Sequence, residues 1–104
     1  MPEELYIGIV GIRALQSSSI LAKGEGAYTN LILFASNAED YKTKAFDFFM
    51  QYGIQIFEYE DVESLEEREK EYDVSEHLLE IARQTAKDAK PRYSSMSFFD
   101  DSGE

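Results

Sequence analysis

The stretch from Ser36 to Gly53 constrains the fold most, because it has the pattern of one helix set between two apolar runs. Ser36 followed three residues later by Glu39 predicts a capping box, and Gly53 stands where a helix C-terminal glycine belongs. The flanking runs, 29–35 and 54–60, are short and apolar, as strands are. Strand, helix and strand in this order predict a right-handed crossover that makes the two strands parallel. The side chains within an arc of about 100° on the helix are Ala38, Tyr41, Ala45, Phe48, Phe49 and Tyr52, which predicts core packing.

Three further elements follow from the same kind of pattern. The run 5–15 is apolar on both alternating faces, which predicts a strand covered on both sides and, by default, antiparallel to 29–35. A second helix is expected over 75–90, with Ser75 as N-cap and Pro91 after its end. The stretch 92–99 alternates enough to predict a final edge strand.

Together these elements predict an α/β fold of the α+β kind, in which two helices pack on a mixed three- to four-stranded sheet. The expected order along the chain is β-β-α-β-α-(β), with a Ser- and Gly-containing loop over 16–27. A chain of 104 residues is expected to form one domain, here over 1–99. Residues 100–104 are expected to be a flexible acidic tail.

Composition excludes several classes of function. The chain has no cysteine, which rules out disulfides, thiolate metal sites and a cysteine nucleophile. A signal peptide is not expected at the N-terminus, and no stretch approaches the ~20 apolar residues of a membrane span. We therefore expect a cytoplasmic protein. The sequence pI near 4.4 argues against nucleic acid and anionic membranes as direct partners and favours a basic protein.

Few residues suggest chemistry, and no cofactor, metal or catalytic residue is expected. His77 is the single histidine and falls on the polar side of its predicted helix, where a catalytic base has no orienting group. The sequence Lys-Gly-Glu-Gly at 23–26 precedes a strand rather than a helix, so it lacks the amide groups that hold phosphate. The serines at 17–19 have no nucleophile-elbow context. The run 58–76 contains no glycine, which argues against a calcium loop.

The most unusual feature is an acidic run from Glu58 to Glu76. It holds ten carboxylates against two cations, Arg68 and Lys70, and so carries −8 of the net charge of −11. As a helix over 62–72 it would have a thin apolar stripe and mostly repulsive i,i+4 pairs, each costing about 0.2–0.5 kcal/mol. The charges are therefore not chosen for helix stability. They indicate either a solvated face that keeps the protein soluble or a surface that binds a basic partner.

We favour the binding surface, because tyrosines are interleaved with the carboxylates. Charges of this kind steer the encounter, and aromatic side chains act as buried anchors. Tyr41 and Tyr52 of the preceding helix are expected to add to these anchors. The predicted partner-binding residues are Glu58, Tyr59, Glu60, Asp61, Glu63, Glu66, Glu67, Glu69, Glu71, Tyr72 and Asp73.

In size, acidity and lack of chemistry the chain is similar to bacterial immunity proteins and to DNA-mimic inhibitors. This likeness is one of composition, and it implies a non-enzymatic inhibitor or immunity-type protein that neutralises a basic toxin, nucleases being one such class. Two other classes stay open: a regulatory domain that holds a metabolite at the loop 16–27, and a small enzyme that uses His77 with a carboxylate.

Overall fold

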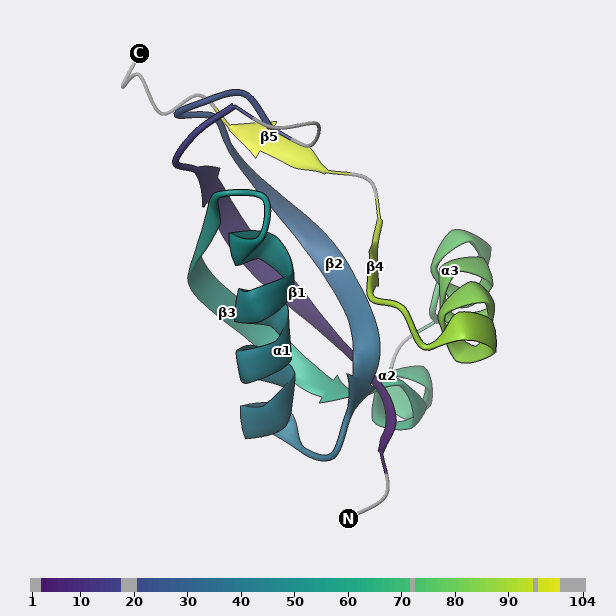
Figure 1. Cartoon of the computed structure of the whole chain (residues 1–104). Helices are drawn as coiled ribbons and strands as arrows, with labels where there is room; N and C mark the ends of the chain where they lie inside the picture. The colour runs from purple at the N-terminus through teal and green to yellow at the C-terminus, as the bar shows by residue number, and fades with distance from the viewer. Residues whose placement is uncertain (1–2, 18–20, 72, 95, 100–104) are drawn as a thin grey trace.

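The computed structural model describes residues 3–17, 21–71, 73–94 and 96–99, except the side chains of 98 and 99 (Figure 1). The predicted tail at 100–104 lies outside the described residues. The elements in chain order are β1 (Glu4–Ala14), β2 (Gly26–Ala35), α1 (Ala38–Met50), β3 (Ile54–Ser64), α2 (Leu65–Glu71), α3 (Glu76–Asp88), β4 (Arg92–Tyr93) and β5 (Ser97–Phe99). The α+β class is confirmed, with three helices in place of the two expected. None of the described helices combines the length and the apolar character that crossing a membrane requires.

The sheet has the strand order β3-β1-β2-β4, and β5 also pairs with β2. Every described strand pair is antiparallel, so the prediction of a mixed sheet is wrong. The helix α1 does connect two strands that run in the same direction, β2 and β3. They do not pair with each other, because β1 lies between them and is antiparallel to both. The central strand is therefore β1, and β3 is at an edge.

The helix α1 covers one face of the sheet and builds the main core there (Figure 1). Tyr41, Ala45 and Phe49 are fully buried against the sheet, which confirms the predicted core stripe. The Tyr41 hydroxyl, although buried, donates a 2.8 Å hydrogen bond to the carbonyl oxygen of Leu31. The cap differs from the prediction. Asn37, not Ser36, is the N-cap, and its side chain accepts from the backbone N–H of Asp40.

The opposite face, called here the second face, is covered at one end by α2 and α3. A smaller core of Ile7, Ile32, Leu65 and Ala82 lies there. Ser75 caps α3 as predicted, by accepting from the backbone N–H of Leu78. The predicted strand over 92–99 is present in two short parts, β4 and β5, which both pair with β2.

Most carboxylates of the acidic run lie on a strand and on the helix that follows it. Strand β3 continues to Ser64, beyond the predicted end at residue 60, and α2 follows at once. Two irregularities in the register with β1 allow this long strand to bend. Asp61 lies at the second of them with a φ of 51°. Four of the ten carboxylates of the run therefore lie on β3 and four on α2, while Asp73 follows α2 and Glu76 is the first residue of α3.

Candidate functional site

The carboxylates of β3 and α2, together with Asp73 just after α2, are called here the acidic edge. On β3, Glu58, Glu60 and Glu63 pair with Gly11, Ile9 and Ile7 of β1 and so lie on the second face, along an edge strand of the sheet. Most of these side chains are exposed, and those of Glu58 and Glu63 are partly buried. Tyr72 lies outside the described residues. The residues of the acidic edge are Glu58, Glu60, Asp61, Glu63, Glu66, Glu67, Glu69, Glu71 and Asp73.

Carboxylates within the acidic edge lie close enough to repel one another. The pKa of Glu60 is raised. The main cause is a hydrogen bond with the side chain of Glu58, and the charge of Glu58 is the next. The charge of Glu63 is the main cause of the raised pKa of Glu71. In the folded chain, β3 and α2 therefore bring negatively charged side chains close to one another.

One buried cation organises the inner side of this edge. Arg68 on α2 is only 9% exposed and forms an ion pair with Glu63 of β3. Its guanidinium also donates to the backbone carbonyl oxygen of Asp61, at 2.6 Å. Glu63 is therefore a structural partner of Arg68 as well as a member of the acidic edge. The sequence did not reveal this pair, because a spacing of five residues is not a neighbour spacing on a helix.

Three of the predicted tyrosine anchors, Tyr41, Tyr52 and Tyr59, are among the described residues, and each is at least partly buried. Tyr41 is fully buried, so the expectation that it contacts a partner is wrong. Tyr52 is half-buried and packs edge-on against Phe48, with 5.7 Å between the ring centroids. Tyr59 is half-buried on the α1 face, where its hydroxyl donates to the carbonyl of Lys42.

A different aromatic pair lies next to the acidic edge on the second face. Phe57 of β3 is 45% exposed and meets Tyr28 of β2 edge to face, with ring centroids 6.0 Å apart. The Tyr28 hydroxyl donates a 3.0 Å hydrogen bond to Oε1 of Glu58. The guanidinium carbon of Arg13 lies over the Phe57 ring, 5.9 Å from its centroid. The sequence reasoning missed this pair because it treated Phe57 only as part of an apolar strand.

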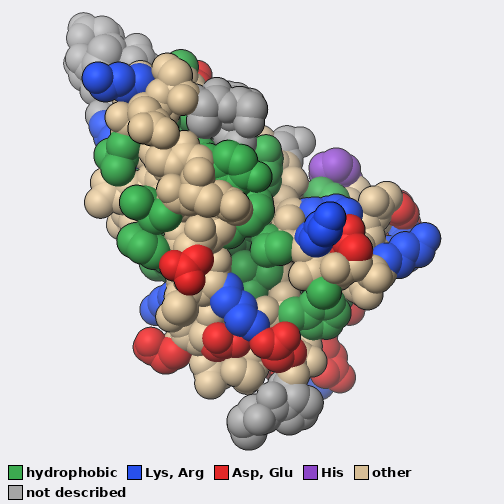
Figure 2. Space-filling model, in the orientation of Figure 1, with side chains coloured by type: hydrophobic (Ala, Val, Ile, Leu, Met, Phe, Trp, Pro, Cys, Tyr) green, Lys and Arg blue, Asp and Glu red, His purple; other side chains and the backbone are tan. Residues whose placement is uncertain are grey.

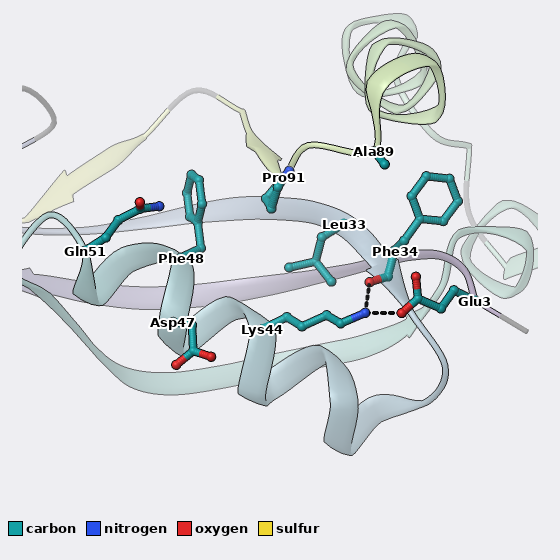
Figure 3. A pocket seen from close by; sticks show the side chains of 9 residues that line it. All are labelled: Glu3, Leu33, Phe34, Lys44, Asp47, Phe48, Gln51, Ala89 and Pro91. Atoms are coloured by element: carbon teal, nitrogen blue, oxygen red, sulfur yellow. Dashed lines mark hydrogen bonds and ion pairs between the residues drawn. The ribbon is translucent and has the colours of Figure 1, made fainter. Parts of the chain in front are cut away.

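The α1 face has a hollow of about 480 Å³ between α1 and the segment that leads into β4 (Figure 3). Leu33, Phe48 and Pro91 contribute its apolar wall. Lys44 is the cation at its rim, and it pairs with Glu3 and Asp40 and donates to the carbonyl oxygen of Phe34. This lysine is already neutralised, which makes the hollow a poor site for an anion.

The surroundings of the hollow have no dominant sign of charge. Figure 2 shows acidic and basic side chains next to one another around a band of hydrophobic side chains on this face. Of the predicted loop 16–27, none of the residues that the structure describes, 16–17 and 21–27, lines the hollow. A metabolite site at that loop therefore gains no support from this cavity.

His77 is exposed on α3, near its N-terminal end, as the sequence predicted. In the part of the chain that the structure describes, no three histidine, aspartate or glutamate side chains are grouped so that they could hold a metal ion. The small-enzyme alternative therefore depends on an exposed histidine that does not line the hollow described above.

Comparison with known proteins yields no relative, since no family model, no curated protein and no solved structure matches the chain.

Proposed function

We propose that this chain is a non-enzymatic binding protein whose acidic edge holds a basic protein partner. In this role it acts as an inhibitor or immunity-type protein, and its partner is a toxin or another protein with a concentrated positive site, such as a nuclease. The lack of cysteine fits a reducing compartment such as the cytoplasm, where we expect it to act.

The observation that carries the proposal is the crowding of carboxylates along β3 and α2. A surface that serves only solubility does not require its carboxylates to lie in contact with one another, and on the face in Figure 2 charges of both signs are interspersed. On the acidic edge, neighbouring carboxylates instead raise the pKa values of Glu60 and Glu71. Holding like charges together works against folding, and a basic partner would relieve that repulsion.

The form of the acidic edge also suits a nucleic-acid-binding partner. Its carboxylates occur one after another along an extended strand and the helix that follows it, a row in which most side chains are exposed. Arginine and lysine side chains that normally contact successive phosphates can pair with such a row. Occupying those side chains would block access of nucleic acid to the partner.

The test compares two triple variants with equal changes in charge. In the first, Glu60, Glu67 and Glu71 are changed to Gln, which leaves the pair of Glu63 with Arg68 intact. In the control, Glu4 and Glu39 are changed to Gln and Asp47 to Asn, at exposed sites away from the acidic edge. Association with a panel of folded basic nucleases is measured at two salt concentrations, together with their activity on nucleic acid.

We expect the first variant to associate more slowly and to lose much of its salt dependence, since exposed charges are screened over about 8 Å at physiological salt. The control variant should behave like the wild type. Equal rates for all three proteins at both salt concentrations would reduce the acidic edge to a solubilising surface.

A ligand-binding role is the second candidate, and the hollow in Figure 3 is the observation that favours it. Its size is within the range of small-molecule sites, about 300–1,000 Å³. Thermal stabilisation by a metabolite, lost in Phe48→Ala, would support that role.

A further inference from the structure

The second face of the sheet is covered at one end and carries an exposed aromatic side chain at the other. At the covered end, Ile7 and Ile32 are fully buried beneath α2 and α3. Toward the other end, β1 places Ile9 beside Glu60 and Gly11 beside Glu58, while β2 places Tyr28 on the other side of Gly11. This second region is called here the open half, and it consists of Ile9, Gly11, Tyr28, Phe57, Glu58 and Glu60.

Gly11 makes the open half a continuous aromatic surface. A Cβ atom at this position would lie 2.8 Å from the Phe57 ring and 2.9 Å from the Tyr28 ring. Because glycine has no such atom, the two rings lean across β1 from the neighbouring strands and meet edge to face. Phe57 keeps 45% of its surface exposed in this arrangement.

Carboxylates border this aromatic surface on the β3 side. The hydrogen bond from Tyr28 fixes the carboxylate of Glu58 next to the rings, and Glu60 lies next to Glu58. An aromatic ring beside a carboxylate is the combination that suits a guanidinium, which can stack on the ring and donate two parallel hydrogen bonds. The chain itself provides a precedent, since the guanidinium of Arg13 already lies over Phe57.

We propose that the basic partner docks on the open half and places an arginine side chain against Phe57, with its guanidinium bound to Glu58 and Glu60. This inference rests on the proposed function and names the contact that anchors it. Charge decides the occupant, because the chain carries a net charge of −11 and the open half adjoins the acidic edge. The rest of the acidic edge then guides the encounter, while the aromatic surface and the two carboxylates hold the complex.

The test uses two capped peptides of equal charge, one of alternating glycine and arginine and one of alternating glycine and lysine. Binding is followed by the backbone amide NMR signals of the isotope-labelled protein. We expect the largest shifts at Gly11, Tyr28, Phe57 and Glu60. We also expect the arginine peptide to bind roughly 2- to 5-fold more tightly than the lysine peptide, as a stacked guanidinium implies.

Two matched variants identify the aromatic contact. Phe57→Leu keeps an apolar side chain but removes the ring, and it should abolish the preference for arginine. Phe46→Leu is the control, because Phe46 is also 45% exposed but lies on α1, away from the open half. The control should retain the preference.

The outcomes separate this inference from the proposed function. Shifts confined to α2, or an arginine preference that survives Phe57→Leu, overturn the docking site and leave the acidic edge as the binding surface. Shifts distributed over exposed carboxylates in all parts of the molecule also overturn it. If neither peptide binds and the Glu60, Glu67 and Glu71 triple variant associates with basic nucleases as the wild type does, both proposals fail.

Discussion

The hydroxyl of Tyr28 on β2 donates a 3.0 Å hydrogen bond to the carboxylate of Glu58 on β3, across the strand β1 that separates them. The bond is possible because Gly11 of β1 lies between the two residues and presents no side chain. The bond itself is the main cause of a raised pKa for Tyr28. An edge strand and an inner strand are thus linked on the face where we place the partner.

Gly11→Ala should break this link. The new methyl group would lie within 3 Å of both rings, so Phe57 and Tyr28 must move apart. We expect a loss of about 1–3 kcal/mol in the free energy of unfolding, as for other overpacked sites, measured by urea denaturation. Adding Phe57→Leu should recover part of that loss, because the smaller side chain makes room. An unchanged stability in Gly11→Ala would contradict the tight approach.

The phenylalanine side chains of α1 should differ sharply in how much they contribute to the free energy of unfolding. Phe49 is fully buried, so Phe49→Ala should lower the free energy of unfolding by about 3–5 kcal/mol. Phe46 is on the same helix but exposed, and Phe46→Ala should change stability by less than about 0.5 kcal/mol. Thermal and urea denaturation of the two variants give the comparison. Similar losses in both would mean that α1 packs differently.

Periodicity predicted the parts of the fold that depend on local pattern. The helix over 37–52 and the strands around 5–15 and 29–35 were confirmed because apolar spacing over many residues reports burial directly. The antiparallel pairing of β1 with β2 was predicted and is confirmed. The pairing of β1 with β3 was not predicted, since the crossover rule fixes the direction of β2 and β3 but not which strand lies between them. The N-cap is Asn37, one residue after the predicted Ser36, because asparagine is as good an N-cap residue as serine.

The sequence was enough to predict that the candidate site is acidic, but not how its side chains are arranged in the fold. Composition located the acidic residues, whereas their division between β3 and α2 depends on tertiary contacts such as the pair of Arg68 with Glu63. The expectation that Tyr41 contacts a partner failed for the same reason. Tyr41 belongs to the core stripe that the sequence also predicted, and a side chain in that core cannot also face a partner. Phe57 and Tyr28 become neighbours only through strand pairing.

Arg68 should be the most sensitive charged residue of the acidic run. Arg68→Ala would leave Glu63 and the Asp61 carbonyl oxygen without their donor in a largely buried place. We expect a loss of about 3 kcal/mol, at the low end for a broken buried pair, in the free energy of unfolding. Lys70→Ala is the control, since Lys70 is exposed on the same helix, and it should be nearly neutral. Equal effects would show that Arg68 contributes no more than a surface charge.

His77→Ala should leave both folding and partner binding unchanged. The side chain is exposed, and its helix is capped by Ser75 rather than by the histidine. The thermal midpoint and the affinity for basic nucleases are the measurements. Loss of function in a variant that still folds would favour the enzyme alternative instead.

The crowding of carboxylates should appear as a pH-dependent gain in stability when two of them are neutralised. Neighbouring carboxylates raise the pKa values of Glu60 and Glu71, mainly through Glu58 and Glu63 respectively. A carboxylate whose pKa is higher in the folded state binds more protons there, so its ionisation destabilises the fold as pH rises through that value. The double variant Glu60→Gln, Glu71→Gln should therefore have a higher thermal midpoint than the wild type at pH 7. That difference should shrink as the pH falls and vanish below the ordinary glutamate range near 4, where the wild-type side chains are also neutral.

Glu4→Gln, at an exposed position on β1, is the control and should show no such trend. A difference that stays constant between pH 7 and pH 4 would mean that the substitutions act through something other than charge repulsion, and the main support for the acidic edge as a binding surface would be lost.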